Sequence, residues 1–271
     1  MRYKMIALDL DGTLTNSEKI ITPKTKKALF DYQEQGGRVV LASGRPTQGI
    51  TPLAEELELA EYGGYILAFN GGRVINCKTQ EVIYNKTLEI SMVKELEDLA
   101  KKFKTNIMTY EGDYIYTLNA NEPYVKEEQR IIKLPVKQVE SMAAKLTGPV
   151  NKCLMTAEPA YLEQVEQQIK EIVGDRIGVY RSQPFFLELV PQNIDKAESL
   201  ASLLQKLHFT REDLIACGDG YNDLSMIRYA GLGVAMENGE EGVKKYADYI
   251  APSNDEDGIA YVLEKFIFRA A

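Results

Sequence analysis

The sequence contains few of the residues on which several common kinds of site depend. Its 271 residues include one histidine, His208, and three widely spaced cysteines, Cys77, Cys153 and Cys217. A single histidine argues against a histidine-based zinc site and against a Ser-His-Asp triad. An odd number of distant cysteines is typical of buried, reduced thiols and does not predict a disulfide framework.

Long apolar runs and blocks of positive charge are also missing. The apolar stretch before Asp9 is too short for a signal peptide, and no segment has the length of a membrane span. The 32 basic and 40 acidic side chains give a formal charge of -8, without a lysine or arginine cluster for nucleic acid or anionic lipid. We therefore expect a cytoplasmic protein, monomeric or a small homo-oligomer, that binds neither nucleic acid nor a membrane.

Motifs for nucleotides and for calcium are absent or incomplete. The sequence has neither a P-loop, GxxxxGK followed by Ser or Thr, nor a GxGxxG dinucleotide fingerprint. The stretch "SNDEDGIAYVLE" has Ser253 where an EF-hand loop requires its first aspartate, although four later positions agree: Asp255, Asp257, Gly258 and Glu264. The preceding "ADYIAP" does not have the pattern of the entering helix of an EF-hand. We therefore expect the start of a helix here, with a calcium loop as the alternative.

The first part of the chain alternates strand and helix patterns. Apolar runs at 3–10, 38–43 and 64–69 predict strands buried on both faces, and the segments 22–37 and 51–60 between them predict helices. Thr22 and Pro23 suit the N-cap and the first position of the first helix. This βαβ rhythm is typical of a parallel sheet.

A different pattern interrupts this rhythm from about Val74. Hairpin patterns mixed with helices predict an antiparallel α+β unit that closes with the segment 177–191. The βαβ pattern then returns, with a helix at 195–207 and a strand from Leu214. We expect a Rossmann-like, doubly wound α/β core, residues 1–81 and 188–271, with an α+β cap domain inserted at residues 82–187.

Two acidic clusters follow buried strands of the predicted core. Asp9 and Asp11 lie in "ALDLDGTLT", and Asp219 and Asp223 lie in "CGDGYNDLS". An Asp-Gly turn explains Asp11. It does not explain Asp9, which lies at the end of the buried apolar run and has no partner for its charge. Open α/β sheets bind ligands at the carboxyl edge of the strands, and carboxylate oxygens suit Mg²⁺. The two clusters together therefore predict a metal site with one carboxylate more than the metal needs. Taken singly, each cluster is also explained by a turn and an N-cap.

Two further segments offer groups that a phosphate would need. Ser43, Gly44 and Arg45 in "LASGRP" end a strand with a hydroxyl and backbone N–H groups near a helix start, although a plain Ser-Gly turn explains them equally well. Lys196 lies in the first turn of a helix, where it opposes the helix dipole, so it has an anionic partner or is a solvated surface lysine. Three residues are candidates for lining a pocket between core and insert, and each is equally a surface or turn residue: Arg45, Asn70 and Arg181.

Taken together, these segments resemble one family, the haloacid dehalogenase superfamily of phosphotransferases. The resemblance is to its Cof-type, sugar-phosphatase-like branch, which has a large α+β cap between its second and third motifs. "DLDGT", "ASGRP", "FNGG", a lysine before a helix, "GDGYND" and "NDEDGIA" occur in the order and approximate spacing of the family along essentially the whole chain. One departure is Ala197, because many relatives have glycine after the lysine.

The resemblance implies a mechanism and a role for each motif. Asp9 would attack the phosphorus and become an aspartyl phosphate, and Asp11, oriented by Thr13, would protonate the leaving group and then activate water. The implied Mg²⁺ ligands are Asp9, the backbone carbonyl of Asp11 and Asp219, with Asp223 steadying the site. The groups implied in binding the phosphoryl group and substrate are Ser43, Gly44, Arg45, Lys196 and Asn222.

We therefore expect a Mg²⁺-dependent phosphatase of small phosphorylated metabolites, with sugar phosphates as the leading class. One alternative keeps the aspartyl phosphate but transfers it, as in a phosphomutase or phosphotransferase. Another is a non-enzymatic phosphoacceptor or ligand-binding regulator, for which a long-lived phosphorylated Asp9 would be expected. An acid-base group such as Asp11 argues against the regulator, since it serves mainly to complete a catalytic cycle.

Overall fold

The chain is divided into two compact units. The computed structural model describes residues 2–269. Contacts group Met1–Tyr84 with Asp195–Ala271, here called the core unit, and Asn85–Ile194, here called the inserted unit. The boundaries expected from the sequence, 82 and 187, lie a few residues nearer the N-terminus. The difference arises because β5 (Val82–Asn85) joins the sheet of the core unit, while β11 (Phe186–Pro191) pairs within the sheet of the inserted unit.

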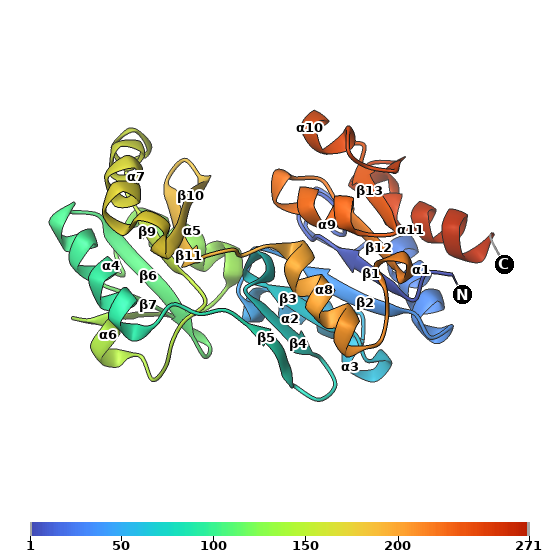
Figure 1. Cartoon of the computed structure of the whole chain (residues 1–271), viewed down its shortest axis with the longest axis horizontal. Helices are drawn as coiled ribbons and strands as arrows, with labels where there is room; N and C mark the ends of the chain where they lie inside the picture. Colours follow the sequence, from blue (N-terminus) through green and yellow to red (C-terminus); the bar gives the residue numbers. More distant parts are fainter. Residues whose placement is uncertain (1, 270–271) are drawn as a thin grey trace. The chain divides into compact units, whose positions relative to one another are not determined.

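The core unit is built on an eight-stranded sheet in the order β14-β13-β12-β1-β2-β3-β4-β5 (Figure 1). The strands from β14 to β3 are parallel, and β4 runs antiparallel to β3. Their bounds are β1 Met5–Leu8, β2 Arg38–Ala42, β3 Tyr65–Ala68, β4 Arg73–Asn76, β12 Leu214–Gly218, β13 Leu232–Met236 and β14 Tyr249–Ala251. Because β2 and β3 extend the sheet on one side of β1 and β12 to β14 extend it on the other, the sheet is doubly wound, as predicted.

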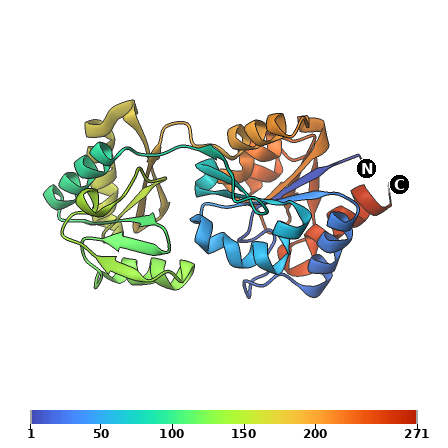
Figure 2. The same cartoon turned by 90° about the horizontal axis from the view of Figure 1, so that it is seen from below.

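Helices cover both faces of this sheet. The helices are α1 Pro23–Glu34, α2 Thr47–Glu56, α3 Leu59–Tyr62, α8 Lys196–Lys206, α9 Leu224–Tyr229, α10 Glu241–Lys244 and α11 Gly258–Leu263. Figure 2 shows the orange helix α8 and the blue helices α1 and α2 on opposite sides of the strands. On the first side, Leu200 and Leu203 of α8 and Met226 of α9 belong to one buried cluster with residues of β1 and β2. At the start of α1, Thr22 accepts the Thr25 N–H at 3.2 Å, which confirms the predicted cap.

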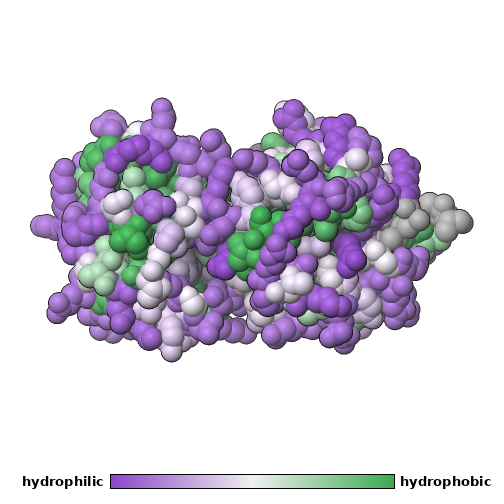
Figure 3. Space-filling view, turned by 60° about the horizontal axis from the view of Figure 1, so that its bottom comes forward, coloured by the Kyte–Doolittle hydropathy of each residue, from purple (hydrophilic) through white to green (hydrophobic). Residues whose placement is uncertain are grey.

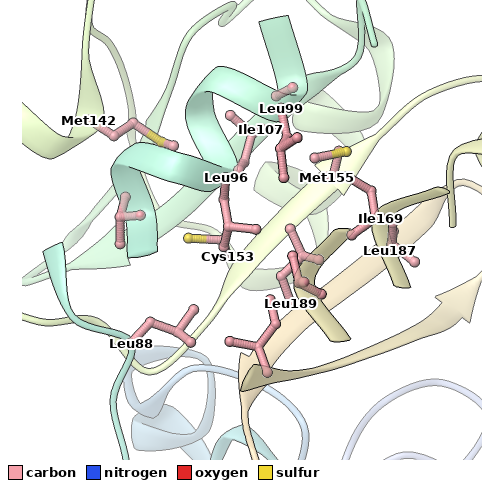
Figure 4. Close-up of a cluster of buried hydrophobic side chains, with 14 of the residues drawn as sticks. Leu88, Leu96, Leu99, Ile107, Met142, Cys153, Met155, Ile169, Leu187 and Leu189 are labelled. Atoms are coloured by element: carbon pink, nitrogen blue, oxygen red, sulfur yellow. The ribbon is translucent and has the colours of Figure 1, made fainter. Parts of the chain in front are cut away.

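The inserted unit is an α+β fold with a six-stranded sheet in the order β10-β11-β9-β6-β7-β8. All its neighbouring strands are antiparallel except β7 and β8. The elements are α4 Ile90–Lys102, β6 Asn106–Glu111, β7 Tyr114–Thr117, α5 Pro123–Ile132, β8 Val136–Gln138, α6 Met142–Lys145, β9 Cys153–Thr156, α7 Pro159–Val173 and β10 Ile177–Gln183. Side chains of α4 and α7 pack on one sheet face in the cluster drawn in Figure 4, which includes Leu96, Ile107, Met155, Ile169 and Leu187.

The cysteines agree with the expectation from the sequence. All three cysteines are buried and free, which confirms the prediction of reduced thiols. Among residues 2–269, no helix is both long enough and apolar enough to cross a bilayer. The face shown in Figure 3 is mostly hydrophilic, with apolar residues gathered in separate patches.

Candidate active site

The predicted site residues follow four adjacent strands of the core unit. Asp9 comes directly after β1, Asp219 after β12 and Ser43 after β2, while Asn70 lies just beyond the end of β3. These strands are parallel neighbours, so their carboxyl ends lie at one edge of the sheet. From β1 the chain adds β2 and β3 on one side, and it later adds β12 to β14 on the other side, so the strand order switches between β1 and β12. Open α/β folds bind their ligands at such a switch point. The topology therefore brings the sequence motifs together as predicted.

Lys196 joins two of the carboxylates. Its Nζ donates to Asp9 Oδ1 at 2.7 Å, to Asp223 Oδ1 at 2.6 Å and to the Ala42 carbonyl oxygen at 2.8 Å. Burial alone would lower the pKa of this lysine, but Asp223 and Asp9 outweigh it and raise the pKa, so the side chain stays charged. The side chain is 0% exposed, which excludes the solvated surface lysine that the sequence left open. Its three donors are all in use.

The glycine turn after β3 positions this lysine. Gly71, in the "FNGG" motif, has a φ of +101°, and a Cβ here would lie 2.3 Å from the Asp195 carbonyl oxygen. Asp195 is the N-cap of α8, where its side chain accepts the Glu198 N–H at 3.0 Å. Only glycine therefore lets the start of α8, with Lys196 as its first residue, come this close to the end of β3.

Asp9, Asp219 and Asp223 form a cluster of three carboxylates with oxygens within 4.8 Å of one another. Burial and then Asp223 raise the pKa of Asp9 to about 8, even against the attraction of Lys196. Burial also raises the pKa of Asp219 to about 6. One lysine therefore does not balance the negative charge of the cluster. A divalent cation would, and an all-oxygen donor set is the kind that Mg²⁺ prefers.

Asp223 differs from the other two carboxylates because both its oxygens are already bonded. Oδ1 accepts from Lys196, and Oδ2 accepts the N–H groups of Asp219 at 3.1 Å and Gly220 at 3.0 Å. Oδ2 of Asp9 and Oδ2 of Asp219 accept no hydrogen bond from the described part of the chain. Asp9 and Asp219 are therefore the carboxylates that fit direct contact with a cation, while Asp223 holds the loop that carries Asp219.

Gly12 and Thr13 support Asp219. Gly12 has a φ of +88°, and a Cβ at this position would lie 2.5 Å from Asp219 Oδ2. The hydroxyl of Thr13, which the family resemblance assigned to Asp11, instead donates to Asp219 Oδ1 at 2.8 Å. This is a correction to the expected contact. The "DLDGT" motif thus makes room for Asp219 with its glycine and orients it with its threonine.

Asp11 is paired with two cations, Arg45 and Lys19. Arg45 donates to Asp11 through Nε at 3.0 Å and Nη2 at 2.8 Å, and Lys19 Nζ donates at 3.0 Å. Burial by itself raises the pKa of Asp11, but Arg45 and Lys19 outweigh it and hold the pKa below its usual value. An acid catalyst must start protonated, so these contacts favour the opposite state. Arg45, expected at the phosphate, is paired with Asp11 instead.

Ser43, Gly44, Asn70 and Asn222 form a second polar group. Ser43 is 4% exposed, and its Oγ accepts the Arg45 N–H at 3.2 Å. Its hydroxyl hydrogen has no acceptor within residues 2–269. Asn222 donates to Asn70 Oδ1 at 3.2 Å, and the Asn70 amide lies beside Gly44. These groups come from the ends of β2, β3 and β12 and could donate to a phosphoryl oxygen.

The remaining candidates lie outside this group. Arg181 belongs to the inserted unit, where it donates to Glu166 at 2.7 Å. Asp255 binds the N–H and hydroxyl of Ser17, both at 2.7 Å, and Asp257 binds the Thr22 hydroxyl. The aspartates of the possible calcium loop are therefore used in binding another loop, and α11 begins at Gly258.

Comparison with known proteins identifies the family. Residues 6–263 match the haloacid dehalogenase-like hydrolase family. The chain belongs to this family. A haloacid dehalogenase-like hydrolase from Bacteroides thetaiotaomicron is similar in structure, with a TM-score of 0.95 and 49% identity over 98% of this chain and 100% of that one. A proposed phosphatase of Streptococcus pyogenes serotype M6 is 33% identical over 99% of this chain and 100% of its own.

A third similar protein narrows the kind of hydrolase. A solved subclass IIB sugar phosphatase of the haloacid dehalogenase superfamily has a TM-score of 0.79 and 26% identity, covering 97% of this chain and 98% of that one. The haloacid dehalogenase-like chain is therefore an enzyme, and its relatives are consistent with a phosphoric monoester hydrolase. This agrees with the resemblance drawn from the motifs.

Some residues near the site of this hydrolase carry no signal in the sequence. Lys19 contacts Asp11 from a turn, where its φ is 63°, and no periodic pattern marks such a position. Asn238 donates to the Gly12 carbonyl at 2.8 Å, from a loop more than 200 positions along the chain. The "NDEDGIA" motif could have indicated a role for Asp255, which contacts Ser17, but its EF-hand-like spacing suggested a calcium loop instead.

Proposed function

We propose that this haloacid dehalogenase-like hydrolase is a Mg²⁺-dependent phosphomonoesterase that acts on small phosphorylated metabolites, with sugar phosphates as the leading class. One observation carries the proposal: a fully buried Lys196 bridges Asp9 and Asp223, with Asp219 within 4.8 Å of both. A buried site with more carboxylates than cations suits a divalent cation and a phosphate ester that it binds.

In the proposed reaction Asp9 is the nucleophile. A carboxylate oxygen of Asp9 forms a bond to phosphorus while the bond from phosphorus to the ester oxygen breaks, which leaves an aspartyl phosphate. Water then attacks this phosphorus, releases inorganic phosphate and restores the carboxylate. Lys196 holds Asp9 in place through a hydrogen bond to Oδ1. Mg²⁺, held by Asp9, Asp219 and the Asp11 backbone carbonyl, would supply charge neutralisation for the phosphoryl oxygens.

Asp11 is proposed as the acid for the leaving alkoxide and then as the base for water. The acid role requires the carboxyl group to leave its pairing with Arg45, which holds it ionised. We expect Arg45 to exchange Asp11 for the oxygens of the bound substrate, which removes one of the two cations that lower the pKa of Asp11 and so favours its protonation. In this way Arg45 keeps the substrate-binding role predicted from "ASGRP", although the structure pairs it with Asp11.

The phosphoryl oxygens are proposed to meet the hydroxyl of Ser43, the Gly44 N–H and the Asn222 side chain. The unused Ser43 hydrogen supports this assignment. The donors of Lys196 are already taken, so its contribution is chiefly its positive charge. The inserted unit is proposed as a cap that excludes water and selects the leaving group. The solved sugar phosphatase to which the chain is similar supports sugar phosphates as the first substrates to test.

The proposal is tested by phosphate release from a panel of phosphorylated metabolites, with MgCl₂ or with EDTA. The panel contains glucose 6-phosphate, fructose 6-phosphate, ribose 5-phosphate and p-nitrophenyl phosphate. We expect Mg²⁺-dependent release, and a loss of about 10³-fold or more in Asp9→Asn. Asp31→Asn is the matched control, because this exposed aspartate pairs with Lys27 on α1.

Each step of the proposal has an outcome that would contradict it. Full activity of Asp9→Asn would remove the nucleophile assignment, and full activity in EDTA would remove the metal. Transfer of the phosphoryl group to a second sugar, without free phosphate, would favour a phosphomutase or phosphotransferase.

A further inference from the structure

Residues 12–20 follow Asp9 and Asp11, and they end in a turn that is closed by hydrogen bonds. Asn16 closes this turn: its N–H donates to the Ile20 carbonyl at 3.0 Å, and its Oδ1 accepts the Ile20 N–H at 3.1 Å. The Lys19 N–H donates to the Asn16 carbonyl at 2.9 Å. Lys19 in turn reaches Asp11 Oδ1 with its Nζ at 3.0 Å. The position of Lys19 against Asp11 therefore depends on where this turn is held.

Two asparagines from distant loops hold the beginning of the segment. Asn238, after β13, donates from Nδ2 to the Gly12 carbonyl at 2.8 Å. Asn254, after β14, donates from Nδ2 to the Thr15 carbonyl at 2.9 Å. The two are linked, because the Asn254 N–H donates to Asn238 Oδ1 at 3.0 Å. Both loops follow parallel strands of the core sheet, so they lie at the same edge as the site.

Asp255 holds the turn itself. Its Oδ1 accepts the Ser17 N–H and its Oδ2 accepts the Ser17 hydroxyl, each at 2.7 Å. These two bonds hold the pKa of Asp255 below its usual value. A two-point contact to one residue fixes direction as well as distance. Because exposed contacts add little to global stability, this arrangement is better suited to placing a turn than to stabilising the fold.

We propose that Asn238, Asn254 and Asp255, here called the loop clasp, position Lys19 and through it the Asp11 carboxylate for proton transfer to the leaving group. The inference rests on the proposed function, in which Asp11 is the acid and base. Asp255 is then a positioning residue, since it acts through the Ser17 turn and Lys19 and not on the substrate. Placement of a reacting group matters because an error of about 1 Å can cost on the order of 100-fold in rate.

The test compares two leaving groups in Asp255→Ala. An alkoxide needs a proton to depart, whereas p-nitrophenolate departs with little help. We expect kcat/KM to fall about tenfold for the sugar phosphate that the wild-type protein hydrolyses fastest, and at most about twofold for p-nitrophenyl phosphate. Asp255→Asn keeps an acceptor for the Ser17 N–H and should restore most of the loss. Equal losses on both substrates would overturn the proposal.

Substitution of Lys19 provides a second test of the proposal. Lys19→Ala should show the same dependence on the leaving group, and Asp255→Ala with Lys19→Ala should be no worse than Lys19→Ala alone, because both changes act through one contact. Additive losses would mean that Asp255 acts by another route. Should Asp255→Ala fail to fold, Ser17→Ala removes only the hydroxyl contact, and we expect about a threefold loss with the same preference.

Asp213→Ala is the matched control. Asp213 accepts the Thr210 N–H at 2.8 Å and the Thr210 hydroxyl at 3.2 Å, which repeats the two-point contact of Asp255. It lies before β12, at the opposite edge of the core sheet from the site. We expect this variant to keep both kcat/KM values within about twofold. A selective loss on the sugar phosphate here would show that the leaving-group effect is not specific to the clasp.

Hydrogen exchange separates the failure of the clasp from the failure of the proposed function. In Asp255→Ala, the amides of residues 12–20 should exchange about tenfold faster, with those of β12 unchanged. If the wild-type protein releases no phosphate, the proposed function fails whatever the exchange shows. If phosphate release is normal but exchange at residues 12–20 does not change, the clasp alone is wrong.

Discussion

Each unit of this haloacid dehalogenase-like hydrolase buries a lysine, and the two lysines differ in the charge around them. In the inserted unit, Lys152 donates to one carboxylate, that of Glu188, at 3.0 Å. In the core unit, Lys196 donates to two carboxylates, and a third lies close to both. Both pKa values are raised, because nearby carboxylates outweigh burial. Glu188 and then Glu128 raise the pKa of Lys152, so two carboxylates lie near that lysine, whereas three lie near Lys196. The larger surplus of negative charge around Lys196 favours the core unit as the place of a ligand site.

Replacing each buried lysine with methionine should give the largest difference between the two units. Lys196→Met leaves two buried carboxylates without their cation, so phosphate release should fall by about 10³-fold or more. The free energy of unfolding should fall by about 3–5 kcal/mol, measured by urea denaturation. Lys152→Met should cost a similar free energy, while release from p-nitrophenyl phosphate stays within about fivefold of the wild-type rate.

A paired substitution sharpens this contrast. Lys152→Met with Glu188→Leu removes both charges of this ion pair, and replacing a buried ion pair with apolar residues is often close to neutral. We expect this double variant to recover most of the lost stability. Loss of activity in the double variant would show that Lys152 and Glu188 also serve the reaction, and the distinction between the two lysines would be wrong.

Mg²⁺ should stabilise the core site and leave the ion pair of the inserted unit unaffected. At about 100 times the dissociation constant, a ligand of the folded state adds about 2.7 kcal/mol to the free energy of unfolding. We expect a gain of this order in MgCl₂ over EDTA, measured by urea denaturation. Asp219→Asn should lose most of the gain, and Glu188→Gln should keep it. An equal gain in all three proteins would place the ion elsewhere.

Much of the fold could be predicted because β1, β2 and β12 are continuous apolar runs that end in polar motifs. The carboxyl edge then follows from parallel pairing, which brought Asp9, Lys196 and Asp219 together. α5 was not predicted, although Glu122 and Pro123 form a clear start, because its polar sequence has only a narrow apolar stripe. The contact of Thr13 with Asp219 and the pairing of Arg45 with Asp11 were not predicted, since which neighbouring group a donor reaches depends on side-chain geometry that spacing does not encode.

The pH dependence of the metal-free protein should reveal the charge surplus. The pKa of Asp9 is raised to about 8, whereas an unfolded aspartate titrates near 4. Between about pH 4 and pH 8 the folded state keeps a proton that the unfolded state has released, so the free energy of unfolding falls as the pH rises. The expected slope is on the order of 1 kcal/mol per pH unit. Urea denaturation in EDTA at pH 6, 7 and 8 measures it.

Asp9→Asn should remove most of this slope, since asparagine does not titrate. Glu188→Gln should retain it, because Glu188 is not among the groups that shift the pKa of Asp9. A wild-type stability that is constant or rises from pH 6 to pH 8 would contradict the raised pKa of Asp9.

The smallest expected effect concerns the hydroxyl that supports Asp219. Thr13→Val keeps the shape of a side chain that is 1% exposed but removes the 2.8 Å hydrogen bond to Asp219 Oδ1. Groups that orient metal ligands typically contribute about tenfold or more to affinity, so we expect Mg²⁺ binding to weaken about tenfold in calorimetric titration. Thr13→Ser restores the hydroxyl and should bind nearly as the wild-type protein does. Because Thr13 bonds to Asp219 and not to Asp11, the loss of activity should disappear at saturating Mg²⁺. A loss of kcat that persists at saturating Mg²⁺ would instead support the role in orienting Asp11 that the family resemblance implied.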